Sequence, residues 1–216
     1  MRQFAIIGLG RFGSKVARTL ASMKVPVIAI DKDPRRVDDL RDVVDFALEA
    51  DATDPKALAQ AGVSESDVAV ISLGNYLEAS VLATILLKEI GIQEIIVKGT
   101  SPEHGKILSL VGATQVVFPE EDIATRLAQR IISPNVLDLI PLFPGYSIVE
   151  LMAPTDFVGK TLLDLNIRRN YGLEVLIIKK GESAKVIPSA LDSIEYGDAL
   201  VVLGKDEDIE KLKSLS

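Results

Sequence analysis

The sequence contains no cysteine and no tryptophan, and it has a single histidine among its 216 residues. Without cysteine the chain forms neither disulfides nor thiolate metal sites, a composition that fits the cytoplasm. No apolar run approaches the roughly 18 residues that a membrane-spanning helix needs. The first residues lead directly into an apolar strand pattern rather than a signal peptide. We therefore expect a cytoplasmic protein.

The charge balance is acidic, with a formal net charge of −7. General nucleic-acid binding depends on neutralising phosphates with lysine and arginine, so we expect no nucleic-acid partner. The hydrophobic fraction of 48% is ordinary for a globular protein, and the length suits one large domain or two small ones. The composition therefore points to a globular protein that reads a small ligand.

Short apolar runs alternate with helical patterns as far as about residue 130, which is typical of a doubly wound parallel sheet with crossover helices. The pattern predicts strands near 2–8, 26–30, 45–49, 67–72, 94–98 and 115–118. It predicts helices near 12–23, 34–43, 55–61, 76–90, 103–111 and 119–132. The fold class that we predict is therefore α/β, with a Rossmann-like sheet.

The first strand runs into a glycine turn in which Gly8, Gly10 and Gly13 fit the pattern G-x-G-x-x-G. This pattern brings backbone N–H groups and a helix N-terminus close to phosphate. Asp31 follows at the expected distance of about 20 residues, where an acidic side chain binds ribose hydroxyls. The combination predicts a nucleotide site, although each residue alone is also an ordinary turn residue.

Arg11 lies inside the glycine motif, so its guanidinium starts beside the expected phosphate site. Arginine–phosphate contacts are charge-assisted and often bidentate, which favours a ligand with extra terminal phosphate charge. The alternative is an arginine that points to solvent. The turn Asp51-Ala52-Thr53 after the third strand could border an adenine ring, or it could be a simple polar turn.

Glu120 follows Pro119 at the start of the helix near 119–132, with two further acidic residues after it. These residues complement the helix dipole, and one of them could also hold a divalent cation beside phosphates. His104 has no cysteine partner and is expected on a helix as a surface or packing residue. No serine nucleophile motif is present, so we expect no enzymatic activity and name no catalytic residue.

Composition changes at Ser133-Pro134, and residues 134–144 combine prolines with apolar residues, which predicts a packed linker. Strands are expected at 146–152, 173–179, 184–187 and 199–203, with helices near 160–165 and 206–214. About 70 residues give a marginal core, so this second domain should lean on a partner copy or on the first domain. The apolar helices 76–90 and 119–132 either pack within the core or contact another subunit.

The whole chain resembles the RCK/KTN proteins, and within them the KtrA-type gating subunit of potassium transport systems. The motifs that carry the resemblance are Ile7-Gly8-Leu9-Gly10-Arg11-Phe12-Gly13, Pro119-Glu120-Glu121-Asp122, Tyr146 to Leu151, and Leu165 to Gly172. The resemblance implies an RCK_N domain at 1–133, an apolar linker at 134–144 and an RCK_C domain at 145–216. The RCK_C domain is expected to be a small α+β domain.

The resemblance implies a regulatory subunit that forms an octameric ring of dimers beneath a membrane-embedded potassium-translocating subunit of KtrB or TrkH type. ATP activates and ADP inactivates such a ring, with Glu120 holding Mg²⁺ or Ca²⁺ and Arg11 contacting the terminal phosphate across a dimer interface. The expected nucleotide site consists of Gly8, Gly10, Arg11, Phe12, Gly13, Asp31, Lys32, Asp51, Ala52, Thr53, Leu73, Gly74, Asn75 and Lys98.

The sequence leaves open whether two further ligands bind, cyclic di-AMP and NAD(H). RCK_C domains can bind cyclic di-AMP between two copies, and Arg168 and Pro188 occupy matching positions. Glu174 stands where relatives can carry a neutral amide, and a carboxylate there would repel the dianion. The second is NAD(H), because Asp31 and the glycine pattern also suit an NAD-linked oxidoreductase or an NAD-sensing regulator.

Overall fold

The structure is a computed structural model that describes residues 2–132 and 135–215. The chain divides into two compact units, Met1–Glu120 and Glu121–Ser216. None of the helices in the described ranges is both long enough and apolar enough to cross a membrane.

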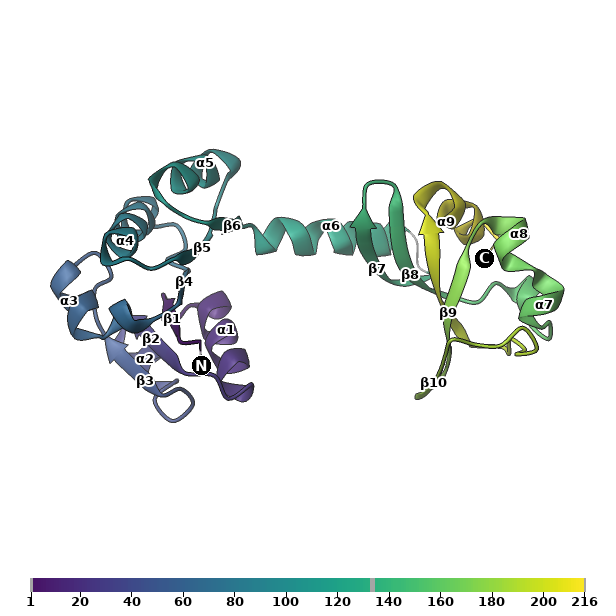
Figure 1. Cartoon of the computed structure of the whole chain (residues 1–216), viewed down its shortest axis with the longest axis horizontal. Helices are drawn as coiled ribbons and strands as arrows, with labels where there is room; N and C mark the ends of the chain where they lie inside the picture. Colours follow the sequence, from purple (N-terminus) through teal and green to yellow (C-terminus); the bar gives the residue numbers. More distant parts are fainter. Residues whose placement is uncertain (1, 133–134, 216) are drawn as a thin grey trace. The chain divides into compact units, whose positions relative to one another are not determined.

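The first unit contains a parallel sheet whose strands can be followed in Figure 1. The strands are β1 (Phe4–Ile7), β2 (Val27–Asp31), β3 (Phe46–Glu49), β4 (Val68–Ile71), β5 (Glu94–Lys98) and β6 (Gln115–Val117). Their order is β3-β2-β1-β4-β5-β6, with Ile7 of β1 in register with Ile30 and Ile71. This is the doubly wound order, so the predicted fold class is confirmed.

The helices of this region are α1 (Arg11–Ser22), α2 (Pro34–Asp38), α3 (Pro55–Gln60), α4 (Leu77–Ile90), α5 (Pro102–Val111) and α6 (Pro119–Ile132), with a 3₁₀ turn η1 (Val63–Glu65). Three of them, α2, α3 and α5, begin where the sequence places a capping residue before proline. The side chains of Asp33, Asp54 and Ser101 each accept a hydrogen bond from a backbone N–H in the first turn. These caps satisfy amide groups that have no partner inside the helix.

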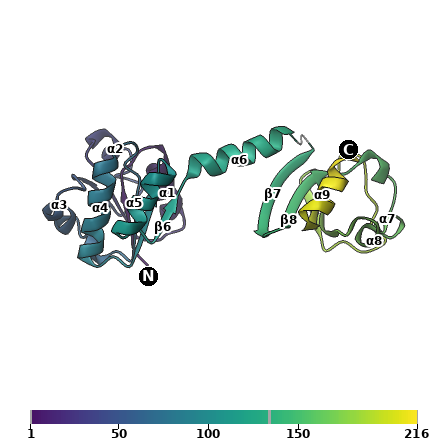
Figure 2. The same ribbon diagram turned by 90° about the horizontal axis from the view of Figure 1, so that it is seen from above.

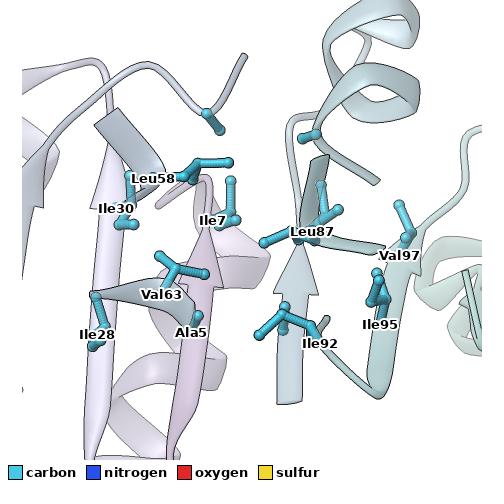
Figure 3. Close-up of a cluster of buried hydrophobic side chains, with 14 of the residues drawn as sticks. Ala5, Ile7, Ile28, Ile30, Leu58, Val63, Leu87, Ile92, Ile95 and Val97 are labelled. Carbon is cyan, nitrogen blue, oxygen red and sulfur yellow. The ribbon is translucent and has the colours of Figure 1, made fainter. Parts of the chain in front are cut away.

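Alternate residues of β1 supply the cores on the two faces of the sheet, as the period of two requires. Ala5 and Ile7 belong to the cluster that also holds Leu58 of α3 and Leu87 of α4 (Figure 3). Ile6 points to the other face, where the cluster includes residues of α1 and α2. The helices therefore cover both faces, and the carboxyl ends of the strands form the edge at which a ligand could bind.

One predicted helix is shorter than expected. The sequence predicts a helix at 34–43, whereas α2 ends at Asp38 and is followed by turns in which Leu40 N–H donates to Val37 O and Arg41 N–H to Asp38 O. Acidic residues crowd the end of this segment, where the negative end of a helix dipole disfavours them. The chain therefore tightens into turns that still bury Leu40.

The second unit is built on an antiparallel sheet, seen from two sides in Figures 1 and 2. Its strands are β7 (Val136–Phe143), β8 (Tyr146–Met152), β9 (Glu174–Lys180), β10 (Ser183–Val186) and β11 (Ala199–Lys205), in the order β10-β9-β11-β8-β7. Its helices are the 3₁₀ turn η2 (Thr155–Phe157), α7 (Leu162–Leu165), α8 (Ile167–Tyr171) and α9 (Asp206–Lys213). Ile209 and Leu212 of α9 join the buried core over this sheet.

Most of the expected linker at 134–144 forms strand β7, Val136–Phe143. β7 pairs with β8 from Val136 to Phe143, with a register irregularity between Pro141 and Phe143. It lies at the end of the sheet, where proline is tolerated because one side of the strand needs no donor. Pro141, one of the prolines that suggest a linker, therefore lies in an edge strand.

The end of the first domain is predicted at 133, and Ser133-Pro134 lies outside the described residues. The first compact unit already ends at Glu120, in the first turn of α6. The rest of α6 belongs with the second unit, since Ile123, Arg126 and Leu127 line a hollow with residues of β7. The domain boundary at 133 stays a prediction.

The segment after α7 contains a second short helix, α8, which the sequence pattern does not predict. Asn166 separates the two helices, because it adopts a left-handed conformation with φ of 44°. Asparagine tolerates this region better than most residues. The break turns α8 so that Arg168 lies near β9, as the ion pair described below shows.

Candidate functional site

The three glycines of the β1–α1 loop meet different surroundings. A Cβ on Gly8 would lie 2.3 Å from Ser72 O, and one on Gly13 would lie 1.9 Å from Gly8 O. A Cβ on Gly10 would meet nothing within 4 Å. Gly8 and Gly13 are therefore required by the fold itself, whereas the open space beside Gly10 is where a ligand could approach the backbone.

The N-terminus of α1 faces this loop without a negative group of its own. Gly10 is the N-cap and makes no side-chain capping hydrogen bond, and the first turn holds no acidic residue. The positive end of the helix dipole is thus not neutralised by its own side chains. This is the arrangement in which helix N-termini bind phosphate.

Asp31 is buried, with 6% exposure, at the end of β2. Its carboxylate accepts hydrogen bonds from Leu9 N–H at 2.6 Å and Asp33 N–H at 2.9 Å, and Arg36 Nη1 lies 3.3 Å away. Asp31 therefore ties the glycine loop to β2, in addition to its predicted role toward ribose. Arg36 is missed by sequence reasoning, although its position on α2 five residues after Asp31 is a usable signal.

The turn after β3 is held by hydrogen bonds between its own residues, Asp51 and Thr53. Asp51 Oδ1 accepts hydrogen bonds from Thr53 N–H at 2.9 Å and Thr53 Oγ1 at 2.7 Å, and Ala52 is buried. The Thr53 hydroxyl, the Thr53 amide and the charge of Lys32 hold the pKa of Asp51 below its usual value. Asp51 therefore presents a charged carboxylate near Lys32 at the carboxyl edge of the sheet.

The turn after β4 contains Leu73, Gly74 and Asn75, with Gly74 in the left-handed region at φ of 64°. Leu73 reaches back toward the glycine loop, where a Cβ on Gly8 would lie 3.1 Å from its Cδ2. The next residue, Tyr76, has its ring 4.5 Å from Lys32 Nζ. Tyr76 is missed by sequence reasoning, although it directly follows the predicted turn.

Lys98 and Glu120 pair near the start of α1, whose first residue is Arg11. Lys98 Nζ, at the end of β5, pairs with Glu120 Oε1 and lies 5.9 Å from the ring of Phe12. The pKa of Glu120 is lowered chiefly by the hydrogen bond from Lys98 and further by the charges of Lys98 and Arg11. Two cations and one carboxylate thus share this edge of the sheet.

The donor set suits a divalent cation only in part. No group of three or more acidic or histidine side chains that could hold a metal ion occurs in the described part of the chain. Glu120 offers one exposed carboxylate of the hard oxygen type that Mg²⁺ and Ca²⁺ prefer. A cation at Glu120 would therefore need ligand phosphates to complete its coordination, as Mg²⁺ commonly does.

His104 is buried at 3% exposure, between α4 and α5. Ser80 Oγ donates to Leu77 O and lies 3.0 Å from His104 Nε2, while Thr100 Oγ1 lies 3.0 Å from Nδ1. Burial lowers the pKa of this imidazole. His104 is therefore a hydrogen-bonded packing residue in this structure.

The second unit contains a separate hollow of about 290 Å³ that both Arg168 and Pro188 line. Glu174 lines it as well, and its Oε2 accepts hydrogen bonds from Arg168 Nε at 2.6 Å and pairs with Nη2 at 2.5 Å. The two residues predicted for cyclic di-AMP thus share one hollow. The arginine in it is neutralised by its own chain.

The strand order of the sheet and the glycine loop together define the class of the first domain. The first unit is a Rossmann-like domain of the nucleotide-binding type, and a distinct antiparallel domain follows it. The TrkA-N domain family matches residues 4–119, and the TrkA-C domain family matches residues 146–216. The chain therefore belongs to the RCK family of proteins that join a TrkA-N domain to a TrkA-C domain.

Named relatives are similar in sequence to this chain over nearly its full length. Ktr system potassium uptake protein C of Bacillus subtilis is 39% identical over 98% of this chain and 96% of its own length. Ktr system potassium uptake protein A of the same organism is 36% identical over 99% of this chain and 96% of its own length. The KtrA-type resemblance seen in the motifs is thus confirmed.

Solved structures share the fold. The GsuK channel aligns with a TM-score of 0.70 at 22% identity over 99% of this chain and 39% of the channel chain. A structure of GsuK bound to ADP aligns with a TM-score of 0.51 at 25% identity over 60% of this chain and 34% of its own. This chain thus spans less than half of those longer proteins.

Proposed function

We propose that this protein is a nucleotide-sensing regulatory subunit of a potassium uptake system, in which ATP activates and ADP inactivates. The full-length similarity to Ktr system potassium uptake proteins supports the potassium system. The glycine loop and the ADP bound to a related GsuK protein support the nucleotide. The protein acts as a gate rather than as an enzyme.

The observation that carries the proposal is the cluster of Arg11, Lys98 and Glu120 beside the open side of the glycine loop. A ligand shifts a conformational equilibrium only by its difference in affinity between two states. ATP and ADP differ in the terminal phosphate, so a sensor needs charged groups where that phosphate lies. Arg11 and Lys98 supply positive charge there, and Glu120 supplies a ligand for a cation.

In the ATP-bound state, Glu120 and phosphate oxygens would together hold Mg²⁺ or Ca²⁺. Without that cation, Lys98 neutralises Glu120. The cation would then replace Lys98 as the partner of Glu120, and Lys98 would be free to approach the phosphates. The triphosphate form thereby gains one interaction that the diphosphate form lacks.

Apolar faces that no described residue covers support assembly into a ring of dimers, with eight copies in the arrangement we favour. In α6 the exposed fractions of Ile123, Leu127 and Ile131 are 66%, 55% and 68%. In α5 the exposed fraction of Leu110 is 76%. Two separate self-complementary faces are what a closed ring of dimers requires.

The ring would dock on an integral membrane potassium-translocating subunit of KtrB or TrkH type at the inner face of the cell membrane. This chain would itself remain cytoplasmic and peripheral to the membrane. Changes in ring shape between the ATP and ADP forms would be transmitted to that subunit. No step of this scheme requires bond cleavage in the nucleotide.

Thermal unfolding of the purified protein with ATP, ADP, NAD and NADH, each with and without Mg²⁺ or Ca²⁺, tests the proposal. ATP and ADP should raise the melting temperature, and divalent cations should add to the ATP shift more than to the ADP shift. Stabilisation by NADH alone would support the NAD-linked alternative and overturn the proposal. Lys15→Ala, an exposed change on α1, should behave as wild type and serves as the control.

A further inference from the structure

Tyr76 stands out among the aromatic residues of the first unit because its side chain lies at the rim of the candidate site. It occupies the N-cap position of α4, makes no capping hydrogen bond there, and is 62% exposed. Burying an aromatic ring is among the larger favourable terms in folding. An exposed ring at this rim therefore has a face available for a ligand.

The contact partner of this ring comes from a strand that is not its neighbour. Lys32 follows β2 and Tyr76 follows the turn after β4, and β1 lies between those two strands. Neighbouring strands are about 4.8 Å apart, so the two side chains reach across the end of β1, where the glycine loop begins. The cation–π contact, at 4.5 Å, therefore spans the carboxyl edge above the loop.

The groups around this contact place it at the base end of a bound nucleotide. The phosphates would lie at Gly10 and the start of α1, and the ribose would lie at Asp31, directly before Lys32. The positive charge of Lys32 also helps to lower the pKa of Asp51, which lies in the turn after β3. A base attached to that ribose would extend away from the phosphates, into the space that Lys32 and Tyr76 share.

We propose that Lys32 and Tyr76 form a clamp for the purine base of the nucleotide. Binding of the base separates the Lys32 ammonium group from the Tyr76 ring. The base enters between the ammonium group and the ring, stacks on Tyr76 and receives the cation on its other face. Both interactions suit a flat π-system and depend little on base identity. The clamp rests on the proposed nucleotide function and deepens it, because it assigns the base to residues separate from those that read the phosphates.

Calorimetric titration of the full-length protein with ATP tests the clamp. Tyr76→Ala should weaken ATP by about tenfold, the range of stacking on one aromatic ring, whereas Tyr76→Phe should stay within about twofold of wild type. Lys32→Met should weaken ATP by about threefold, since an exposed cation–π contact contributes less. Tyr196→Ala, which removes an exposed ring from the second unit, should leave binding unchanged.

A spectroscopic readout separates stacking from a structural effect at the start of α4. The chain has no tryptophan, so Tyr76→Trp introduces a single reporter. ATP should quench its emission, while inorganic triphosphate, which lacks the base, should not.

Three outcomes would overturn the clamp while leaving the proposed function intact. They are unchanged ATP affinity in Tyr76→Ala, equal losses in the alanine and phenylalanine variants, and tryptophan emission that ATP does not change. A wild-type protein that binds no adenine nucleotide would overturn both.

Discussion

The two candidate sites of this protein use the same kinds of residue with different charge balance. At the glycine loop, Arg11 and Lys98 face one carboxylate, Glu120. In the second unit, Arg168 faces one carboxylate, Glu174, and is paired with it through two nitrogens. The cluster at the glycine loop thus has one more cation than carboxylate, whereas Arg168 and Glu174 balance each other. The number of cations per carboxylate, rather than the presence of arginine, therefore underlies our prediction that the first site binds an anion more readily than the second.

The largest effect is expected from substitutions that change the backbone of the glycine loop in the first site. Gly13→Ala places a Cβ 1.9 Å from Gly8 O, so we expect a loss of about 3 kcal/mol in the free energy of unfolding. Gly10→Ala meets no atom within 4 Å and should fold nearly as wild type, yet it should weaken ATP because the methyl group enters the ligand space. Urea unfolding and calorimetry measure the two effects. Equal stability of both variants would contradict the assignment of separate roles.

Removing the Arg11 cation from the first site should have the next largest effect. Arg11→Ala should weaken ATP more than ADP, by about 1.5–3 kcal/mol, the cost of one charge-assisted hydrogen bond. We expect this difference because, in the proposed site, only ATP would place a terminal phosphate near the guanidinium. Calorimetric titration with both nucleotides measures it, with Lys15→Ala as the control. Equal losses would show that Arg11 does not distinguish the two.

Neutralising the carboxylate of the second site should leave the positive charge of Arg168 available to an anionic ligand. Glu174→Gln keeps the shape of the side chain but removes the charge that pairs with Arg168. We expect affinity for cyclic di-AMP to rise by about tenfold relative to wild type, in line with the strength of hydrogen bonds to charged groups. Calorimetry on the full-length protein measures this, with Glu182→Gln in the β9–β10 turn as control. Tight wild-type binding would mean that the ligand itself displaces Glu174.

The smallest effect that we predict distinguishes the two units by pH. His104 is the only histidine in the sequence, and burial lowers the pKa of its imidazole in the folded protein below the ordinary value of 6.5. The unfolded chain therefore binds the proton more readily, so stability is full above pH 6.5 and falls as the pH drops below it. Hydrogen exchange, corrected for intrinsic rates, should show α4 and α5 losing protection between pH 7 and about 5.5 while β8 and β11 change less. Uniform loss in both units would assign the effect elsewhere.

Sequence patterns gave reliable guidance wherever a local rule decides structure. Capping residues before proline mark the starts of α2, α3 and α5, because both side-chain caps and the fixed φ of proline act within one turn. They gave poor guidance where pairing partners decide. β7 contains Pro141 and reads as a linker, yet β8 supplies a partner on one side and an edge needs none on the other.

The site divides in the same way. Gly8, Gly13 and Asp31 follow from spacing, because a tight strand–turn–helix unit requires them at fixed offsets. Arg36 could not be assigned to Asp31 without knowing where α2 ends. The predicted nucleotide and cation roles of the other residues remain predictions that the experiments above address.

What the sequence determined by itself is the Rossmann-like order of elements and the glycine loop, since both depend on short-range sterics and on the alternation of apolar residues. Only the tertiary structure decided which side chains share an edge. Lys98 meets Glu120, and Lys32 meets Tyr76, at separations of 22 and 44 residues set by strand order. Those pairings depend on the neighbour relations of parallel strands, and no local pattern along the chain encodes them.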